Sequence, residues 1–518
     1  MRNVTILPSL RLLVLLLLTG LLSGSAFGQF TRSIVADEVA NNGPVYYGNS
    51  RNVARTTTGT LVAIWQDGTG QIVTATYDEA FQDWLLPVQV SFAGDEASKA
   101  GIIADNGGGL HAAWQQREPA GNWQIWYANY LSGTWSAPVR VDSDSLDAEE
   151  CSIEVDSNGR IWVVWNTDNE PDGAEWILAS HSDDTGVSWS SPDTLSSPDG
   201  IINGSSTTSA RVGIWAGSNG RLATIWHEDF PGREREIYVN QYDGSAWQGE
   251  VVVSDTTDTT ITRHWYTNVC MDASDNIYVL FANDRQGSDP RQLLMTSKAW
   301  DASWQPAWTT LYTDTNGDFL TNALTIDPNG NLYAGFRRPK GDGSGTEEVA
   351  YVTSQDGGST WSEPVALSRD GYDAGYLTFV GHVTGSVVDA IWRESYLPGV
   401  DDDDTTAIVY AAIDFTTGIE EPSVVAGEFA LSQNYPNPFN PSTNVRFSVL
   451  SAGDYELAIY NILGEKVRTL THRHYATGEY TSAWDGRNDA GSQVTSGVYF
   501  YRLSSAKQTL TRKMILMK

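Results

Sequence analysis

Residues 159–165 read Gly159-Arg160-Ile161-Trp162-Val163-Val164-Trp165, a turn residue followed by a short apolar strand that ends on an aromatic side chain. The same combination recurs at intervals of about 50 to 60 residues, which indicates an internal repeat. The repeated aromatics are Trp65, Trp114, Trp165, Trp226, Phe281, Phe336 and Trp392. The residues that open the repeats are Gly59, Gly108, Gly159, Gly220, Asp275, Gly330 and Gly385. We expect these positions to need the backbone freedom of glycine or the turn chemistry of aspartate.

A second aromatic follows another turn in every repeat but the last. The members of this series are Trp84, Trp135, Trp189, Trp247, Trp304 and Trp361. The seventh repeat stops after three expected strands, near Asp414, and residues 32–38 resemble the outer strand that it lacks. We therefore predict an all-β fold whose main part is a seven-bladed β-propeller, closed by the N-terminal strand so that no sheet edge is left open. A six-bladed ring is the alternative, and a stack of independent sandwiches is the rival that would leave the short last repeat unexplained.

The composition excludes several classes of protein. The 518 residues contain 64 acidic and 32 basic side chains, so nucleic acid is not an expected partner. The 48 Gly and 20 Trp suit many short strands joined by tight turns rather than a helical fold.

The N-terminus has the pattern of a secretory signal peptide. Arg2 and Arg11 precede the apolar run 12–22, and small residues follow up to Gly28. The run is shorter than the roughly 20 residues of a membrane-spanning helix. We predict a signal peptide over 1–28, a propeller over 29–418, a linker over 419–428 and a small immunoglobulin-like sandwich over 429–518, with no transmembrane segment once the signal is removed.

The C-terminal segment carries an ordered series of motifs. It opens with Gln433-Asn434-Tyr435-Pro436-Asn437-Pro438-Phe439-Asn440-Pro441 within 429–443, and continues with 458–467, 484–487, 496–501 and 513–518. The series resembles the type A C-terminal sorting domain of the type IX secretion system. The resemblance implies that 429–518 is an address read by an outer-membrane translocon, in a Gram-negative host, and that the protein is extracellular or on the outer-membrane surface after passing the periplasm.

Two turns of the second kind contain the full pattern Ser-x-Asp-x-Gly-x-x-Trp. They are Ser182, Asp184, Gly186, Trp189 and Ser354, Asp356, Gly358, Trp361. These turns resemble the Asp-boxes, or BNR repeats, of sialidase-like propellers. We assign them a structural role, because an Asp carboxylate can accept bonds from turn amides and Trp can wedge between sheets. The catalytic residues of sialidases cannot be carried over, because no Arg-Ile-Pro motif lies near the first repeat and no Tyr-Glu pair can be assigned.

Polar loops follow the repeated aromatics, on the face opposite the Asp-box turns. Clustered guanidinium groups there could hold a carboxylate or sulfate, and nearby aromatics could stack on a sugar. The candidate ligand-binding residues are Arg263, Tyr266, His227, Glu228, Arg285, Arg337, Arg338, Arg393 and Glu394. The alternative is that these Arg and Glu side chains pair with one another around the rim. Glu228, Asp229 and Glu394 could also supply two carboxylates for a glycosidase.

We expect no metal and no cofactor. The seven His lack ligand spacing, and Asp401 to Asp404 fit a solvated acidic loop better than a calcium site. Cys151 and Cys270 are expected to be buried free thiols, and the acidic neighbours of Cys151 argue against a nucleophile.

These observations predict a secreted or cell-surface propeller that binds an extracellular glycan, with an acidic glycan as the first candidate. A sialidase-like glycoside hydrolase and a protein-interaction or adhesion scaffold remain the alternatives. No catalytic residue is assigned.

Overall fold

The computed structural model describes most of the chain between residues 30 and 516. The described ranges are 30–39, 51–79, 83–117, 121–131, 133–142, 147–168, 176–196, 211–230, 233–254, 261–285, 290–305, 307–314, 321–340, 346–369, 372–395, 406–415, 430–431, 439, 441–449, 453–461, 464–475, 478–505 and 509–516. The predicted signal peptide 1–28, the predicted linker 419–428 and Asp401 to Asp404 lie outside them. The chain divides into two compact units, one within Gly28–Thr416 and one that includes Thr417–Lys518.

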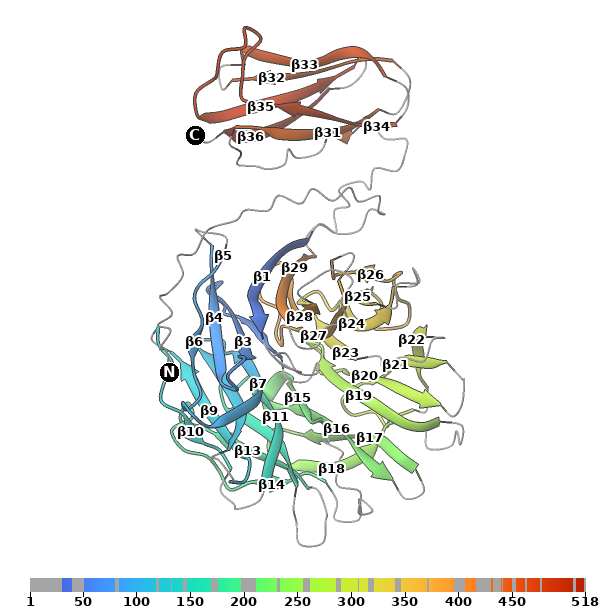
Figure 1. The fold of residues 1–518 in the computed structure, drawn as a ribbon. Helices are drawn as coiled ribbons and strands as arrows, with labels where there is room; N and C mark the ends of the chain where they lie inside the picture. The colour runs from blue at the N-terminus through green and yellow to red at the C-terminus, as the bar shows by residue number, and fades with distance from the viewer. Residues whose placement is uncertain are drawn as a thin grey trace, which may run out of the picture. The chain divides into compact units, whose positions relative to one another are not determined.

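The first unit is a ring of antiparallel blades, each with about four strands (Figure 1). Blade one contains β2 (Val53–Arg55), β3 (Leu61–Gln66), β4 (Ile72–Asp78), β5 (Asp83–Trp84) and β6 (Val88–Gln89). Blade two contains β7 (Glu96–Ala104), β8 (Leu110–Arg117), β9 (Gln124–Tyr130) and β10 (Val139–Arg140). Blade three contains β11 (Asp147–Val155), β12 (Ile161–Asp168), β13 (Trp176–Ser182) and β14 (Asp193–Thr194). Blade four contains β15 (Gly213–Ala216), β16 (Leu222–Phe230), β17 (Arg233–Tyr242) and β18 (Trp247–Val252). Blade five contains β19 (Ile261–Met271), β20 (Ile277–Arg285), β21 (Arg291–Lys298) and β22 (Thr309–Asp314). Blade six is β23 (Asn322–Ile326), β24 (Leu332–Pro339), β25 (Glu347–Ser354) and β26 (Val365–Ala366).

Blade seven joins the two ends of the ring. Its strands β27 (Ala374–Phe379), β28 (Val387–Ser395) and β29 (Thr406–Asp414) come from the end of the unit, and its outer strand is β1 (Phe30–Val39). β1 runs antiparallel to β29, with Phe30 opposite Ile413 and Ile34 opposite Val409. The predicted seven blades and the closing N-terminal strand are therefore confirmed, and the six-bladed alternative is wrong.

The repeat residues take the positions that the pattern predicted. Each repeated aromatic lies on the second strand of its blade and is at most 2% exposed. Each turn residue has a positive φ, from 62° at Asp275 to 93° at Gly59. The second Trp series is half-buried between blades, as when Trp189 meets Tyr127 of the preceding blade with ring centroids 5.2 Å apart.

The second unit is a small sandwich of two sheets. One sheet contains β30 (Ala430–Leu431), β31 (Thr443–Val449) and β34 (Gly478–Trp484), and the other contains β33 (Lys466–Tyr475), β32 (Gly453–Tyr460), β35 (Gly497–Ser504) and β36 (Thr509–Leu516). Leu457, Trp484 and Tyr501 lie in its core and are at most 1% exposed. Within the described residues of the whole chain, no helix has the length and apolarity to cross a membrane.

Candidate functional site at the channel mouth

The inner strands of four blades contain a β-bulge at equivalent positions. In β7 the pairing with β8 passes from Ser98 to Gly101, and β11, β19 and β27 show the same break. The first bulged residue of each strand has a left-handed backbone with φ between 51° and 56°; these residues are Lys99, Glu150, Tyr266 and Tyr376. Such a backbone costs about 1–3 kcal/mol in a residue other than glycine and is found preferentially at functional sites. Bulges also redirect side chains near active sites.

Arg211, directly before β15, has the same backbone with φ 47°. All five residues lie nine positions before the positive-φ turn residue of their own blade, so they stand at one level of the ring. The inner strands of successive blades contact one another and line the central channel. We call Lys99, Glu150, Arg211, Tyr266 and Tyr376 the mouth ring, because they surround the end of the channel opposite the Asp-box turns. Blade six has Thr321 at this position, and the blade-one equivalent, Ser50, lies outside the described residues.

One arc of the mouth ring is a chain of charged side chains. Lys99 Nζ lies 2.6 Å from Glu150 Oε1 and 3.5 Å from Glu149 Oε2. Glu150 Oε2 accepts a bond from the Arg211 backbone N–H at 3.0 Å, and Gln115 Oε1 accepts one from the Glu150 backbone N–H at 2.8 Å. The contacts link blades two, three and four and hold the strained residues in place.

The other feature of the mouth ring is a pair of Arg–Tyr stacks. The Arg211 guanidinium lies 4.4 Å from the centre of the Tyr266 ring, and Arg393 lies 4.8 Å from the centre of Tyr376. Cation–π contacts of this kind contribute about 0.5–2 kcal/mol each. They fix the orientation of two guanidinium groups beside two aromatic rings, which suits recognition of a carboxylate or sulfate on a sugar.

Two predicted Arg residues are paired with carboxylates of the neighbouring strand. Arg338 Nη2 lies 2.7 Å from Glu348 Oε1, and Arg337 forms an ion pair with Glu347. These pairs match the alternative in which rim charges neutralise one another. The structure thus gives Arg337 and Arg338 partners within blade six.

Glu228 and Glu394 hold the repeated aromatics of their blades. Glu228 Oε2 accepts the indole N–H of Trp226 at 3.0 Å, and Glu394 Oε1 accepts that of Trp392 at 2.9 Å. Glu394 also accepts a 2.5 Å bond from Arg369 Nε and is fully buried. These carboxylates act as acceptors inside their own blades.

The remaining predicted residues fall into two groups. Tyr266 belongs to the mouth ring, whereas His227 is a buried residue of β16 with 2% exposure. Arg263 pairs with Asp284 and Arg285 with Ile261 through the backbone, which places both at the mouth end of blade five. Their side chains, and that of Asp229, lie outside the described set.

A buried ion pair lies among the inner strands of the ring. Arg51 Nη1 donates to Glu154 Oε2 at 2.6 Å, its other Nη contacts the Ile214 carbonyl, and its guanidinium lies 4.6 Å from the Trp215 ring centre. His382 Nε2 lies 3.0 Å from Glu154 Oε1. These residues come from blades one, three, four and seven, so the contacts join four blades inside the ring.

The two Ser-x-Asp-x-Gly turns are held by their own side chains. Asp184 accepts bonds from the Ser188 hydroxyl at 2.5 Å and the Ser188 backbone N–H at 2.8 Å, and Asp356 accepts the same two bonds from Thr360 at 2.6 and 2.8 Å. These bonds lower the pKa of each carboxyl to about 2. In both turns the aspartate thus accepts bonds from a side chain and a backbone N–H of its own turn.

The two thiols are free and buried. Burial, rather than the acidic neighbours that the sequence suggested, is the main cause that raises the pKa of Cys151 to about 12, and burial also raises that of Cys270. Neither thiol is therefore an activated nucleophile. In the described part of the chain, no group of three or more His, Cys, Asp or Glu is arranged to hold a metal.

Sequence reasoning missed Lys99, Glu150, Arg211 and Tyr376. A signal was present, since each precedes its turn residue by nine positions. The side chains at these positions differ from blade to blade, so a search for repeated residue types passes over them.

Both units of the chain are similar to known proteins. Residues 440–509 match the FlgD Ig-like domain family. An ulvan lyase of polysaccharide lyase family PL25, solved bound to -[GlcA(1-4)Rha3S]-, superposes with a TM-score of 0.54 at 13% identity, over 72% of this chain and 94% of that chain. A Hadza microbial sialidase superposes with a TM-score of 0.40 at 14% identity, over 69% and 74%. No curated protein matches the sequence. The chain is thus a β-propeller protein with an immunoglobulin-like C-terminal domain.

Proposed function

We propose that the propeller binds an acidic extracellular glycan at the mouth ring. The observation that carries the proposal is the left-handed backbone shared by Lys99, Glu150, Arg211, Tyr266 and Tyr376 at one level of five blades. Strain repeated at one site needs a reason beyond packing, because other residues of the inner strands adopt ordinary β-conformations.

The chemistry of the site supports an acidic sugar. Arg211 brings a guanidinium group and Tyr266 a ring to the mouth ring, and a carboxylate or sulfate is a natural partner of a guanidinium. The second stack, of Arg393 on Tyr376, is more buried, with Arg393 8% exposed. Arg51 and Glu154 form a buried ion pair inside the same ring of blades. A propeller is also the scaffold on which the ulvan lyase was solved with its glucuronate-containing fragment.

The proposal is for binding rather than hydrolysis. Glu228 and Glu394, the two carboxylates considered for catalysis, already accept indole N–H bonds within their blades. A glycosidase needs a carboxylic acid and a second carboxylate that face one substrate.

We also propose that the protein reaches the cell exterior through the type IX secretion system as a member of the Asp-box propellers. The immunoglobulin-like fold of the C-terminal unit and the motif series from Gln433 to Lys518 support the sorting role. The bonding of Asp184 and Asp356 supports the second assignment.

Binding of the full chain to an array of sialylated, sulfated, uronic-acid and neutral glycans tests the function. We expect selective binding to acidic glycans and a loss of about tenfold or more in affinity for Arg211→Gln, as for removal of one charge-assisted hydrogen bond. Arg160→Gln is the matched control, because Arg160 pairs with Asp183 at the opposite end of blade three. An array without acidic-glycan binding, or equal loss in both variants, would contradict the proposal.

A further inference from the structure

The seam between blades seven and one differs from the other seams in its residues. Four positions before the turn residue, blade one has Arg55, where the other blades have Ala104, Val155, Ala216, Met271, Ile326 and Gly381. Three positions before the repeated aromatic, blade seven has Asp389, where the others have Val62, His111, Trp162, Ala223, Tyr278 and Tyr333. No other blade has Arg or Lys at the first of these positions, so the Arg55–Asp389 salt bridge has no equivalent at the same positions of the other seams.

At two other seams the Ser-x-Asp-x-Gly turn closes the space between blades. Gly186 of blade three approaches Tyr127 of blade two so closely that an added Cβ would collide with its ring. Gly358 of blade six approaches Met295 of blade five in the same way. Blade one has no such turn in its sequence, and a cavity of about 450 Å³ lies at this seam. That volume falls in the range of about 300–1,000 Å³ that is usual for small-molecule sites.

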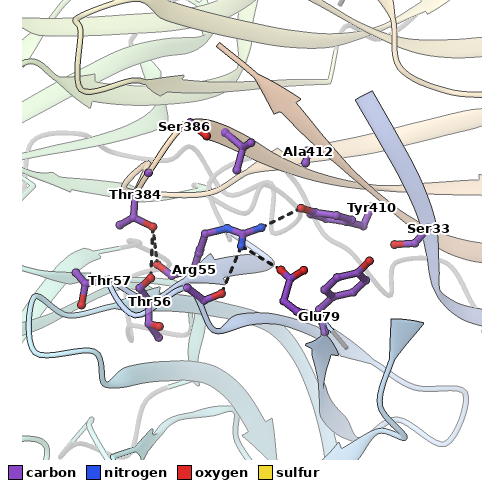
Figure 2. Close-up of a pocket in the computed structure, with 13 residues that line it drawn as sticks. Ser33, Arg55, Thr56, Thr57, Glu79, Thr384, Ser386, Tyr410 and Ala412 are labelled. Carbon is purple, nitrogen blue, oxygen red and sulfur yellow. Dashed lines mark hydrogen bonds and ion pairs between the residues drawn. The ribbon is translucent and has the colours of Figure 1, made fainter. Parts of the chain in front are cut away.

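Arg55 crosses the floor of this cavity (Figure 2). Its Nε and Nη2 donate to Asp389 Oδ2 and Oδ1 at 2.8 and 2.7 Å, and Nη2 also donates to Tyr410 Oη at 3.1 Å. Tyr410 Oη in turn donates to Asp389 Oδ1 at 2.7 Å. The remaining nitrogen, Nη1, lies 3.3 Å from the Gly59 carbonyl and 3.9 Å from Glu79 Oε1.

The charges in the cavity argue against an anionic ligand. Burial would lower the pKa of Arg55, but the bonds and charges of Asp389 and Tyr410 outweigh it and raise that pKa. The guanidinium donates two hydrogen bonds to the Asp389 carboxylate, so it is already paired with one anion. Glu79 also lines this cavity, and its 66% exposed side chain adds a negative charge. An incoming carboxylate or sulfate would meet no uncompensated cation and one repelling carboxylate.

The walls fit a ring that carries hydroxyl groups. Tyr77 and Tyr410 provide aromatic surface, and Val387 and Ala412 add apolar surface. The hydroxyls of Thr57, Ser386 and Ser33 also border the cavity (Figure 2). A few polar groups among aromatic and apolar walls are typical of small-molecule sites, and a sugar can stack on a tyrosine face while its hydroxyls bond to side chains.

We propose that this seam cavity is a second ligand site, which binds a single uncharged sugar residue or a similar neutral polyol. It lies at the turn end of the blades, whereas the mouth ring lies at the other end of the same strands, as the pairing of Gly375 with Arg393 shows for blade seven. The two sites therefore share no residue, and the seam cavity would hold a neutral unit while the mouth ring holds an acidic one.

Saturation-transfer NMR on the full chain tests the site with galactose, glucose, mannose and glucuronate as probes. We expect transfer to at least one neutral sugar, with a Kd in the roughly millimolar range of single-sugar contacts. Transfer to glucuronate reports the mouth ring, so a change in the seam cavity should leave it unaltered. Ser386→Trp should fill the cavity and reduce the neutral signal about tenfold or more. Ser274→Trp is the matched control, since Ser274 occupies the corresponding turn of blade five and is exposed.

A second variant distinguishes loss of sugar binding from a folding defect. Tyr77→Ala removes one aromatic wall without adding bulk, and it should also weaken the neutral signal while the thermal unfolding curve stays cooperative. Absence of neutral-sugar transfer, equal neutral-sugar transfer in Ser386→Trp and the parent protein, or loss of the glucuronate signal together with the neutral one in Ser386→Trp would overturn the proposal. None of these outcomes bears on acidic-glycan binding at the mouth ring.

Discussion

Glu154 is a buried carboxylate that forms ion pairs with Arg51 and His382. Burial alone would raise its pKa, but Arg51 and His382 outweigh burial and lower the pKa from 4.5 to about 2. A carboxyl with a depressed pKa stabilises the folded state fully above its unfolded value of 4.5, and this contribution is lost as the pH falls toward about 2. Removal of the charge would leave Arg51 buried without its anion.

We therefore expect Glu154→Gln to lower the thermal unfolding midpoint at neutral pH, and the gap from the parent protein to shrink as the pH falls from 4.5 to about 2. Unfolding followed by tryptophan fluorescence across this range measures the gap. Asp183→Asn is the control, because Asp183 also pairs with an Arg but is 65% exposed, so its removal should cost little. A gap that stays constant with pH would refute the assigned role of Glu154.

Single residues also show which structural roles could be predicted from the sequence and which could not. Gly and Asp at the turns could be predicted, because positive φ restricts the choice of residue. Glu394 could not, since the same carboxylate on a loop can face solvent or accept an indole N–H, and only the register of β28 decides between them.

The Asp-box turn is the smallest element that repeats with its full bonding pattern. In the second turn the position after the aspartate is Gly357, with φ 68°, but in the first turn it is Thr185, with φ 59°. A β-branched residue is strained there, because its Cβ crowds the backbone. The Thr185 carbonyl accepts bonds from Tyr127 and Asn129, and these need no side chain at Thr185.

We expect Thr185→Gly to stabilise the protein by about 1 kcal/mol, since relief of the left-handed strain exceeds the added freedom of the unfolded chain. The reverse change, Gly357→Thr, should destabilise it by a similar amount. Denaturant unfolding of both variants gives the two values. Destabilisation by Thr185→Gly would mean that the bond from its hydroxyl to the Asp184 carbonyl, 2.6 Å long, outweighs the strain.

The inner strands were harder to predict than the turns. Their bulges at Lys99, Glu150, Tyr266 and Tyr376 use residues without a preference for positive φ, so local sequence gives no warning. Tertiary contacts such as Lys99 to Glu150 across two blades hold the conformation. This explains why the candidate list contained Tyr266 but missed its counterparts.

On the scale of the whole molecule, the ring depends on one pairing between distant ends. β1 covers the outer edge of β29, and the indole N–H of Trp84 donates to Ser33 Oγ at 2.9 Å, which ties the first blade to the same strand. An uncovered β29 would expose a row of unpaired backbone groups. The count of strands in the last repeat was enough to predict this closure from sequence.

We expect a chain that starts at residue 40 to self-associate through β29, whereas the longer chain should not do so through this edge. Light scattering after size exclusion measures the difference. A synthetic peptide of residues 30–39 should restore the original behaviour when it is added to the shortened chain. A shortened chain that stays monodisperse would show that something else covers the edge.

The pairing of β1 with β29 also bears on the order in which parts of the ring can form. Residues 30–39 are the first of the propeller to be made, yet their partner strand is the last, so they must wait unpaired until nearly the whole unit has been synthesised. Contacts so distant in sequence form slowly. We therefore expect ring closure to be a late step of folding, and a bulky extension ahead of Phe30 to slow it.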